Sequence, residues 1–286
     1  MAEVATPATS DQLLVVIDPV ARRTDGESVR IAKDVLSAGA ATKVCLPDGP
    51  EEFARALRRR GSRRPVVVGD DRTLVRAVTL LHRQRELAGC ALAVVPVGSG
   101  LSLARSLGVP AGTVAAARAV LEGVERRMDL LVDDSDGVVL GALRIPPLHA
   151  AAGRQAAAEA AGHPWLRTYQ SLVRTLVPVR PSRGVAPVPA PGPSRLRVEV
   201  DGETLVDLDQ PVEAVSVTPA EAGLAGVEVR PVSVGAEASP LLARGRTVTV
   251  SGAHFRYRAD AAVSGPVRTR TWRVREGAWG LTVPES

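Results

Sequence analysis

The sequence predicts an α/β protein with an N-terminal doubly wound parallel sheet and a C-terminal β-rich antiparallel domain. Up to about residue 132, short apolar runs alternate with helical patterns, which is typical of parallel βαβ units. After that point the alternation stops, and runs of alternating polar and apolar residues take over. We therefore expect one domain over residues 1–132 and a second over residues 133–286.

Each element of the first domain has a local signal. The expected strands are solid apolar runs, and the expected helices repeat apolar residues at helical spacing, with Gly39 and Gly61 closing two of them. The strands are expected at 13–17, 43–46, 66–68, 91–95 and 129–132. The helices are expected at 28–38, 51–60, 73–87, 101–107 and 113–122.

The second domain is predicted from shorter signals. A strand near 138–145 is followed by an Ala-rich segment at 150–161 and an amphipathic segment at 165–177. The Pro-rich stretch 178–193 is interpreted as a linker or loop. Asp201-Gly202 has the composition of a hairpin turn. The remaining strands are expected at 195–200, 227–234, 246–250, 255–258 and 269–274.

Composition excludes several classes of function. The chain has 286 residues and 45% apolar content, enough for a sizeable core. Its net charge of +5 is carried by arginine, because Lys33 and Lys43 are the only lysines. A P-loop or Schiff-base mechanism that needs a later lysine is therefore excluded. Aromatic residues make up only 2% of the chain, which argues against stacking on nucleic-acid bases.

Cysteine use and the N-terminus predict a cytoplasmic protein. Cys45 and Cys90 lie at the ends of expected strands, where a free cysteine behaves as a small hydrophobe, and no Cys-x-x-Cys pair indicates zinc. The N-terminus lacks the basic and apolar regions of a signal peptide. No apolar run reaches the ~20 residues that a membrane span needs. Peripheral contact with a membrane and oligomerisation are left open.

Two glycine-containing turns, each directly after an apolar strand, are the strongest functional signal. They are Gly69-Asp70-Asp71-Arg72-Thr73, after the run at 66–68, and Gly98-Ser99-Gly100, after the run at 92–97. In parallel α/β sheets ligands bind beyond the carboxyl ends of the strands, where glycine lets the backbone approach a phosphate. The two turns therefore predict a nucleotide site at this edge of the sheet.

The order and spacing of these turns resemble the diacylglycerol kinase catalytic family, which includes bacterial lipid kinases and sphingosine kinases and is distantly related to NAD kinases. That family carries Asn-Pro, Gly-Gly-Asp-Gly-Thr, Pro-x-Gly-Thr-x-Asn-Asp and Asp-Gly-Glu, in this order. The matching stretches here are Asp18-Pro19, the turn at 69–73, Pro96 to Ser102, and Asp260-Ala261-Ala262. The resemblance implies an NAD kinase/diacylglycerol kinase-like fold that uses ATP and Mg²⁺ to phosphorylate a lipid hydroxyl.

The resemblance also implies a set of site residues. Asp260 matches the Asp of Asp-Gly-Glu and would be the catalytic acceptor of the hydroxyl proton. The metal ligands cannot be assigned. The nucleotide would be bound by Asp18, Arg22, Gly69, Asp71, Arg72, Thr73, Gly98, Ser99 and Gly100.

Several motif positions differ from the family pattern. Asp70 and Arg72 stand at two glycine positions, Arg22 stands at another, and Leu101 and Ser102 replace Asn and Asp. Each lost phosphate or oxyanion donor typically costs about 10²–10³ in kcat. We therefore expect a lipid kinase-like protein whose phosphoryl transfer is weak or lost. The alternative is a non-catalytic regulatory protein that binds a nucleotide or a phosphate-bearing lipid in the same cleft.

Some of these residues also have structural interpretations. Asp71 could be a helix N-cap, and Asp260 could be a turn residue of the β-rich domain. Arg22 and Arg72 could converge on an anion, or they could form a salt-bridge plug with Asp70 or Asp71.

Three further features have an ordinary structural explanation. The acidic cluster of Asp133, Asp134 and Asp136 is typical of an exposed turn. Trp272 and Trp279 are expected in core or inter-domain packing. The basic patch of residues 58–60, 63 and 64 is typical of a solvated helix end, although it could also contact anionic lipid.

Overall fold

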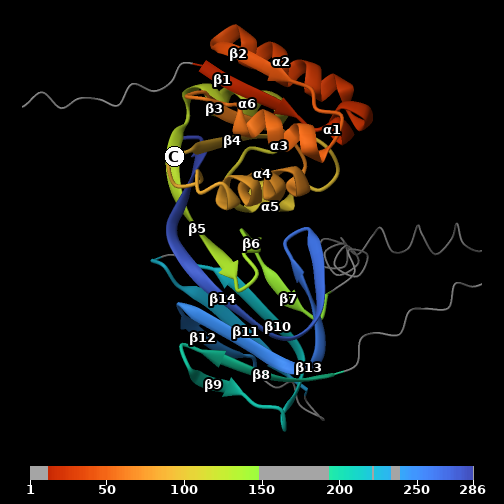
Figure 1. Cartoon of the computed structure of the whole chain (residues 1–286), viewed down its shortest axis with the longest axis vertical. Coiled ribbons are helices and arrows are strands. Elements are labelled where there is room, and N and C mark those ends of the chain that lie inside the picture. Colours follow the sequence, from red (N-terminus) through yellow and green to blue (C-terminus); the bar gives the residue numbers. More distant parts are fainter. Residues whose placement is uncertain (1–11, 148–192, 221, 233–238, 286) are drawn as a thin grey trace, which may run out of the picture.

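The computed structural model describes residues 12–147, 193–220, 222–232 and 239–285. In Figure 1 the helices gather in one part of the molecule, and the later strands form another part, with β5 and β14 running between them. The helices are α1 (Pro19–Thr24), α2 (Gly26–Gly39), α3 (Pro50–Arg58), α4 (Asp71–Arg83), α5 (Ser102–Ser106) and α6 (Thr113–Glu122). The strands of the first part are β1 (Gln12–Ile17), β2 (Ala41–Cys45), β3 (Arg64–Gly69), β4 (Ala91–Pro96) and β5 (Val124–Asp133). The others are β6 (Val138–Val139), β7 (Leu143–Ile145), β8 (Ser194–Val200), β9 (Glu203–Val206), β10 (Pro211–Pro219), β11 (Ala225–Pro231), β12 (Leu241–Gly245), β13 (Thr247–Ala259) and β14 (Ala262–Val283).

The first four strands form a parallel sheet in the order β2-β1-β3-β4. The apolar residues of β1, β3 and β4 are buried along almost their whole length. A parallel sheet is covered on both faces, which explains why these strands read as solid apolar runs in the sequence. Because the strands are parallel, their carboxyl ends and the loops that follow lie at one edge.

The sheet continues from β4 into antiparallel strands through β14. Gly280 and Leu281 of β14 pair in parallel with Ala91 and Leu92 of β4, whereas β14 runs antiparallel to β5 and β13. The further strands β7, β8, β10, β11 and β12 are all joined by antiparallel pairs. The expected α/β class is confirmed. The parallel arrangement is limited to one end of a sheet that is largely antiparallel.

Two hydrophobic cores lie along this sheet. The first contains the apolar faces of β1, β3 and β4 with the helices around them, and it also contains Trp279, Leu281 and Val283 from the end of β14. The second lies among the antiparallel strands, where Trp272 meets Tyr257 edge to face at 5.2 Å. Both tryptophans are fully buried, so the prediction of core packing is confirmed.

Several elements differ from the expected boundaries. Helix α1 was not expected, and it forms because Asp18 caps it and Pro19 occupies its first turn. Strand β5 begins at Val124, earlier than expected, because pairing with β14 extends it through exposed polar residues. The expected strand at 138–145 is two strands, β6 and β7, and the expected strands at 246–250 and 255–258 are one strand, β13.

The hairpin turn expected at Asp201-Gly202 joins β8 to β9, and both of its residues have positive φ, at 51° and 88°. The segments expected at 150–161 and 165–177 lie outside the described residues. The same holds for the Pro-rich stretch, except for Pro193.

We predict that Trp279→Ala lowers the free energy of unfolding by about 3–5 kcal/mol, because the change leaves a cavity in the first core. Urea unfolding followed by circular dichroism would measure this loss. As a control, Val263→Ala changes a residue of the same strand that is 55% exposed, and it should alter stability by less than about 0.5 kcal/mol. An equal effect of the two changes would contradict the assignment of Trp279 to the core.

Candidate functional site

The loops that follow β1, β3 and β4 are hydrogen-bonded to one another at the carboxyl edge of the parallel strands. The Asp18 N–H donates to the Val68 carbonyl at 2.9 Å, and the Val97 N–H donates to the Gly69 carbonyl at 2.9 Å. The Asp71 N–H donates to the Gly100 carbonyl at 2.8 Å. The two glycine turns therefore lie side by side, as their positions in the sequence predicted.

Glycine is required at two positions of this edge. A Cβ atom on Gly69 would lie 2.8 Å from Thr73 Oγ1 and 3.0 Å from the Asp18 Cβ, so no larger residue fits there. Gly98 has a φ of +118°, which L side chains rarely adopt. Gly100 faces open space, and Ser99 beside it is exposed. The glycines thus permit the close packing of the loops as well as an approach to their backbone.

Asp70 is the N-cap of α4. Its Oδ1 accepts hydrogen bonds from the Thr73 N–H at 3.0 Å and from Thr73 Oγ1 at 2.9 Å. An N-cap carboxylate satisfies a free donor of the first helical turn and is favoured by the helix dipole. A bound phosphate would use the same donors. The Asp70 carboxylate thus uses donors at the start of α4 of the kind that bind phosphate at other helix N-termini.

Asp71 connects α4 to α5. Its carboxylate is buried and accepts hydrogen bonds from the Leu103 N–H at 2.9 Å, the Ala104 N–H at 3.0 Å and the Ser102 hydroxyl at 3.3 Å. Asp71 thus satisfies donors at the start of α5, while Asp70 caps α4. The sequence left open that Asp71 is a helix N-cap. In the structure Asp70 is the N-cap residue of α4, and the Asp71 carboxylate binds donors that lie more than 30 residues further along the chain.

Asp18 is buried at the end of β1. Its carboxylate accepts from the Val20 N–H at 2.8 Å and forms an ion pair with Arg76 at 3.3 Å. Arg76 also lies over the ring of Phe53, 5.8 Å from its centroid. Sequence reasoning missed Arg76, because an arginine within a helical pattern carries no signal for a partner near the N-terminus.

The two arginines at motif positions have different surroundings. Arg22 forms an exposed ion pair with Asp48 at 2.9 Å. Arg72 is exposed, and no ion pair of Arg72 is formed within the described parts of the chain. The carboxylates of Asp70 and Asp71 bind Thr73 and the start of α5 instead. The salt-bridge plug interpretation is therefore wrong, because the acidic residues that it requires have other partners.

Asp260 lies in the two-residue turn between β13 and β14 and has a φ of +47°. Its carboxylate accepts three backbone hydrogen bonds from the connection between β6 and β7, at 2.7 Å from Leu140, 2.8 Å from Gly141 and 2.9 Å from Ala142. The structure therefore gives Asp260 the role of a turn residue that binds another loop. Its role as proton acceptor stays a prediction.

The negative charge of Asp71 acts on Asp260. A Cβ on Gly141 would approach both Leu103 of α5 and Asp260 Oδ1, which places the β6–β7 connection against α5. Burial raises the pKa of Asp260, the three backbone N–H groups oppose this rise, and the negative charge of Asp71 adds to it. Asp71 and Asp260, both singled out in the sequence, thus lie on opposite sides of the junction between the helical part and the antiparallel strands.

The acidic cluster lies at the turn between β5 and β6. Asp134 and Asp136 are exposed, as predicted, whereas Asp133 is the last residue of β5 and its side chain is largely buried. Asp133 accepts hydrogen bonds from the Ser135 and Gly137 N–H groups, each at 2.8 Å, and Asp136 contacts His82 at 2.9 Å. Burial raises the pKa of Asp133, but these N–H groups and Arg270 outweigh it, so the net shift is downward. Across the described residues no group of His, Cys, Asp and Glu is arranged to hold a metal ion, and no helix is long and apolar enough to cross a membrane.

These features define a class: an α/β protein with loops gathered at the carboxyl edge of parallel strands, where nucleotides bind in many such sheets. Residues 12–132 match the family model described as the diacylglycerol kinase catalytic domain. The resemblance predicted from the sequence is confirmed.

Solved structures with the same fold come from Bacillus anthracis str. Sterne. One, described as a candidate diacylglycerol kinase, has a TM-score of 0.69 and 14% identity, and the match covers 99% of this chain and 98% of that chain. Another, described as a diacylglycerol kinase, has a TM-score of 0.65 and 12% identity, with coverage of 96% and 97%. Identities this low show a shared fold alone. No curated protein sequence matches the chain.

We predict that the stability difference between the wild type and Asp260→Asn falls as the pH rises. A carboxyl group with a raised pKa contributes stability that is fully present below its unfolded value, near 3.8, and is lost as the pH rises through the folded value. The amide of the variant does not titrate, so other groups cancel in the difference. Urea unfolding of both proteins over a pH series would test this. A difference that grows with pH would show that the three N–H groups outweigh burial.

Proposed function

We propose that the protein is a lipid kinase-like member of the diacylglycerol kinase family, with phosphoryl transfer from ATP to a lipid hydroxyl as its family chemistry and with that activity weak or lost. Support comes from the gathering of the loops after β1, β3 and β4 at one sheet edge, with Asp71 and Asp260 at the adjacent junction. The proposed nucleotide site comprises Asp18, Arg22, Gly69, Asp71, Arg72, Thr73, Gly98, Ser99 and Gly100.

The observation that carries this proposal is that the backbone N–H groups that would bind a phosphate are already hydrogen-bonded to other groups of the chain. The Thr73 N–H is bound by the Asp70 carboxylate, and the Asp71 N–H is bound by the Gly100 carbonyl. A phosphate approaching the start of α4 would meet the Asp70 charge and would have to displace these hydrogen bonds. Like charges brought together at a binding surface cost several kcal/mol, so this edge fits the phosphates of ATP poorly.

The surroundings of Asp260 also favour weak activity. A general base must accept a proton from the substrate at hydrogen-bonding distance. Both carboxylate oxygens of Asp260 already accept backbone hydrogen bonds, and the turn that carries the residue is bound to the β6–β7 connection. The Asp260 side chain is thus held for a structural role, and proton transfer would use only its remaining lone pairs.

The second candidate function is non-catalytic binding of a nucleotide or a phosphate-bearing lipid. The exposed guanidinium of Arg72 favours it, because this group lies in the first turn of α4 and forms no ion pair within the described residues. A cation near a helix N-terminus is unfavourable by itself, and an anion bound there would relieve this cost. Such a ligand could be held without being placed for transfer.

The division into domains 1–132 and 133–286 remains part of this proposal, as do a cytoplasmic location, peripheral contact with a membrane and the use of Mg²⁺.

Calorimetric titration with ATP, with and without Mg²⁺, would test nucleotide binding directly. A turnover assay with ATP, Mg²⁺ and diacylglycerol micelles would test catalysis. We expect turnover far below the usual kinase range of about 1–100 s⁻¹. Wild-type turnover above about 1 s⁻¹ that Asp260→Ala abolishes would contradict the proposed weakness.

We predict that the double change Asp70→Gly and Arg72→Gly, which restores the family sequence Gly-Gly-Asp-Gly-Thr, increases ATP affinity at least about tenfold, because it frees the Thr73 N–H and removes a negative charge. Arg30→Ala with Asp34→Ala, which removes an exposed ion pair on α2 and likewise leaves the net charge unchanged, serves as the control and should leave ATP affinity unchanged. Calorimetry would measure both affinities. Lower affinity in the double variant would show that Arg72 is itself a ligand.

A further inference from the structure

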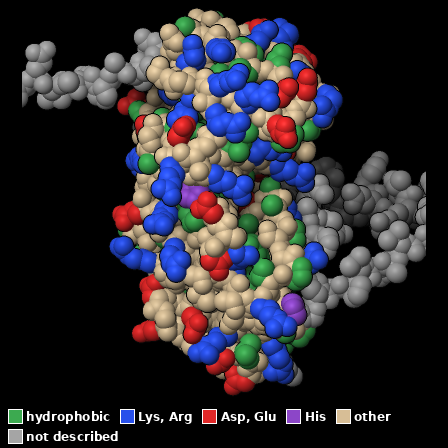
Figure 2. Space-filling view, viewed as in Figure 1, with side chains coloured by type: hydrophobic (Ala, Val, Ile, Leu, Met, Phe, Trp, Pro, Cys, Tyr) green, Lys and Arg blue, Asp and Glu red, His purple; other side chains and the backbone are tan. Residues whose placement is uncertain are grey.

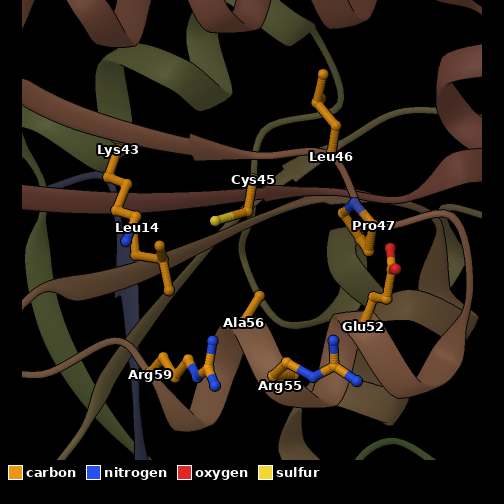
Figure 3. Close-up of a pocket in the computed structure, with 9 residues that line it drawn as sticks. All are labelled: Leu14, Lys43, Cys45, Leu46, Pro47, Glu52, Arg55, Ala56 and Arg59. Carbon is orange, nitrogen blue, oxygen red and sulfur yellow. The ribbon is translucent and has the colours of Figure 1, made fainter.

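A groove between β2 and α3 is open to solvent along the edge of the parallel sheet. It has a volume of about 290 Å³, and Lys43 of β2 faces Arg55 and Arg59 on the α3 side (Figure 3). Among the strands that the structure describes, β2 is the last at this end of the sheet, so none of them pairs with its outer side. Phe53 and Leu57 of α3 are fully buried and anchor the helix. The neighbouring face of α3, which carries Arg55, lines the groove opposite β2.

The groove has an excess of positive charge. Its lining contains three basic side chains, Lys43, Arg55 and Arg59, and one acidic side chain, Glu52. None of the three basic side chains forms an ion pair with the parts of the chain that the structure describes. Glu52 instead accepts a hydrogen bond from the Asp48 N–H at 3.0 Å. The three cations of the groove thus outnumber its single carboxylate, and none of them forms an ion pair within the described residues.

The positions of the two arginines point to an anionic ligand. Arg55 lies in the last turn of α3, and Arg59 is the C-cap residue four positions further on, so the two like charges lie close together and repel each other. Both side chains are exposed. A bound anion would convert this repulsion into two attractive contacts. A guanidinium group is planar and matches phosphate oxygens in pairs, which favours phosphate over a compact anion.

The rim of the groove adds an apolar element. Leu46, next to Pro47, is 51% exposed although it follows a strand. Figure 2 shows that basic side chains are spread over the helical part of the molecule on the face in view. A cationic groove with an apolar rim fits a phosphate group that carries a glycerol or lipid portion.

We propose that the groove between β2 and α3 binds a phosphomonoester or phosphodiester group through Lys43, Arg55 and Arg59. Its volume is near the lower end of the range for ligand pockets, about 300–1,000 Å³, and suits a headgroup. The groove uses no residue of the two glycine turns, so the proposal does not depend on nucleotide binding at the sheet edge. The ligand could come from a membrane lipid or from a free phosphate ester, and both present the same group.

The test compares two double variants of equal charge. Arg55→Ala with Arg59→Ala removes two arginines of the groove, and Arg83→Ala with Arg118→Ala removes two exposed helical arginines outside its lining. Each protein is mixed with vesicles of phosphatidylcholine with and without phosphatidate, and separately titrated with glycerol 3-phosphate. Circular dichroism and urea unfolding verify that both variants fold.

We expect the groove variant to bind phosphatidate vesicles about 30-fold more weakly than the control variant, since each cation near an anionic surface contributes about fivefold. Binding of glycerol 3-phosphate that is lost in the groove variant would identify a free phosphate ester as a source, and loss in the vesicle arm alone would identify a lipid. Equal behaviour of the two variants in both arms would overturn the proposal. So would a wild-type protein that binds neither ligand.

A separate variant distinguishes the groove from the nucleotide site. Asp70→Gly alters the start of α4 and leaves the groove lining intact. We expect it to change ATP binding without changing the binding of phosphatidate vesicles or glycerol 3-phosphate. A parallel change of both would show that the phosphate ligands bind at the sheet edge, and this outcome would contradict the groove proposal but not the proposed function.

Discussion

The antiparallel pairing of β14 with β5 is the interaction on which the rest of the structure depends. The pairing extends from Trp272 opposite Asp133 to Val283 opposite Val124, so two strands far apart in the sequence hold the whole length of the junction. Beyond this pairing, the end of β14 adds to β4 and delivers Trp279 to the first core, while Trp272 lies in the second. Because β14 also begins at the turn that carries Asp260, this pairing sets the position of Asp260 relative to α5 and Asp71.

Carboxylates that bind backbone N–H groups organise the candidate site. Asp18, Asp70, Asp71 and Asp260 each accept such hydrogen bonds at a helix start or a loop. Each bond satisfies a donor that would otherwise be free, which stabilises the loops. The same donors are what a phosphate site offers to its ligand. An acidic residue in place of a glycine therefore stabilises the loop at the expense of anion binding, and this opposition leads to the proposal of weak activity.

Much of the parallel part could be predicted because its signals are local. The buried runs of β1, β3 and β4 and the glycines that follow them specify strands and turns without knowledge of the rest of the chain. The start of β5 could not be predicted in this way. Its residues Glu125, Arg126 and Arg127 carry no apolar pattern, and they form a strand because β14 pairs with them. The groove at β2 also could not be predicted from the sequence, because its cations come together only when α3 packs beside the edge strand.

The sequence by itself determined the α/β class, the order of the two glycine turns and the departures from the family motifs, since each depends on residues close together along the chain. Only the tertiary structure decided how the acidic residues are used. Asp71 binds the start of α5, Asp260 binds the connection between β6 and β7, and Arg22 pairs with Asp48. The physical reason is that a carboxylate binds whichever donors lie within hydrogen-bonding distance, and long-range strand pairing sets those distances.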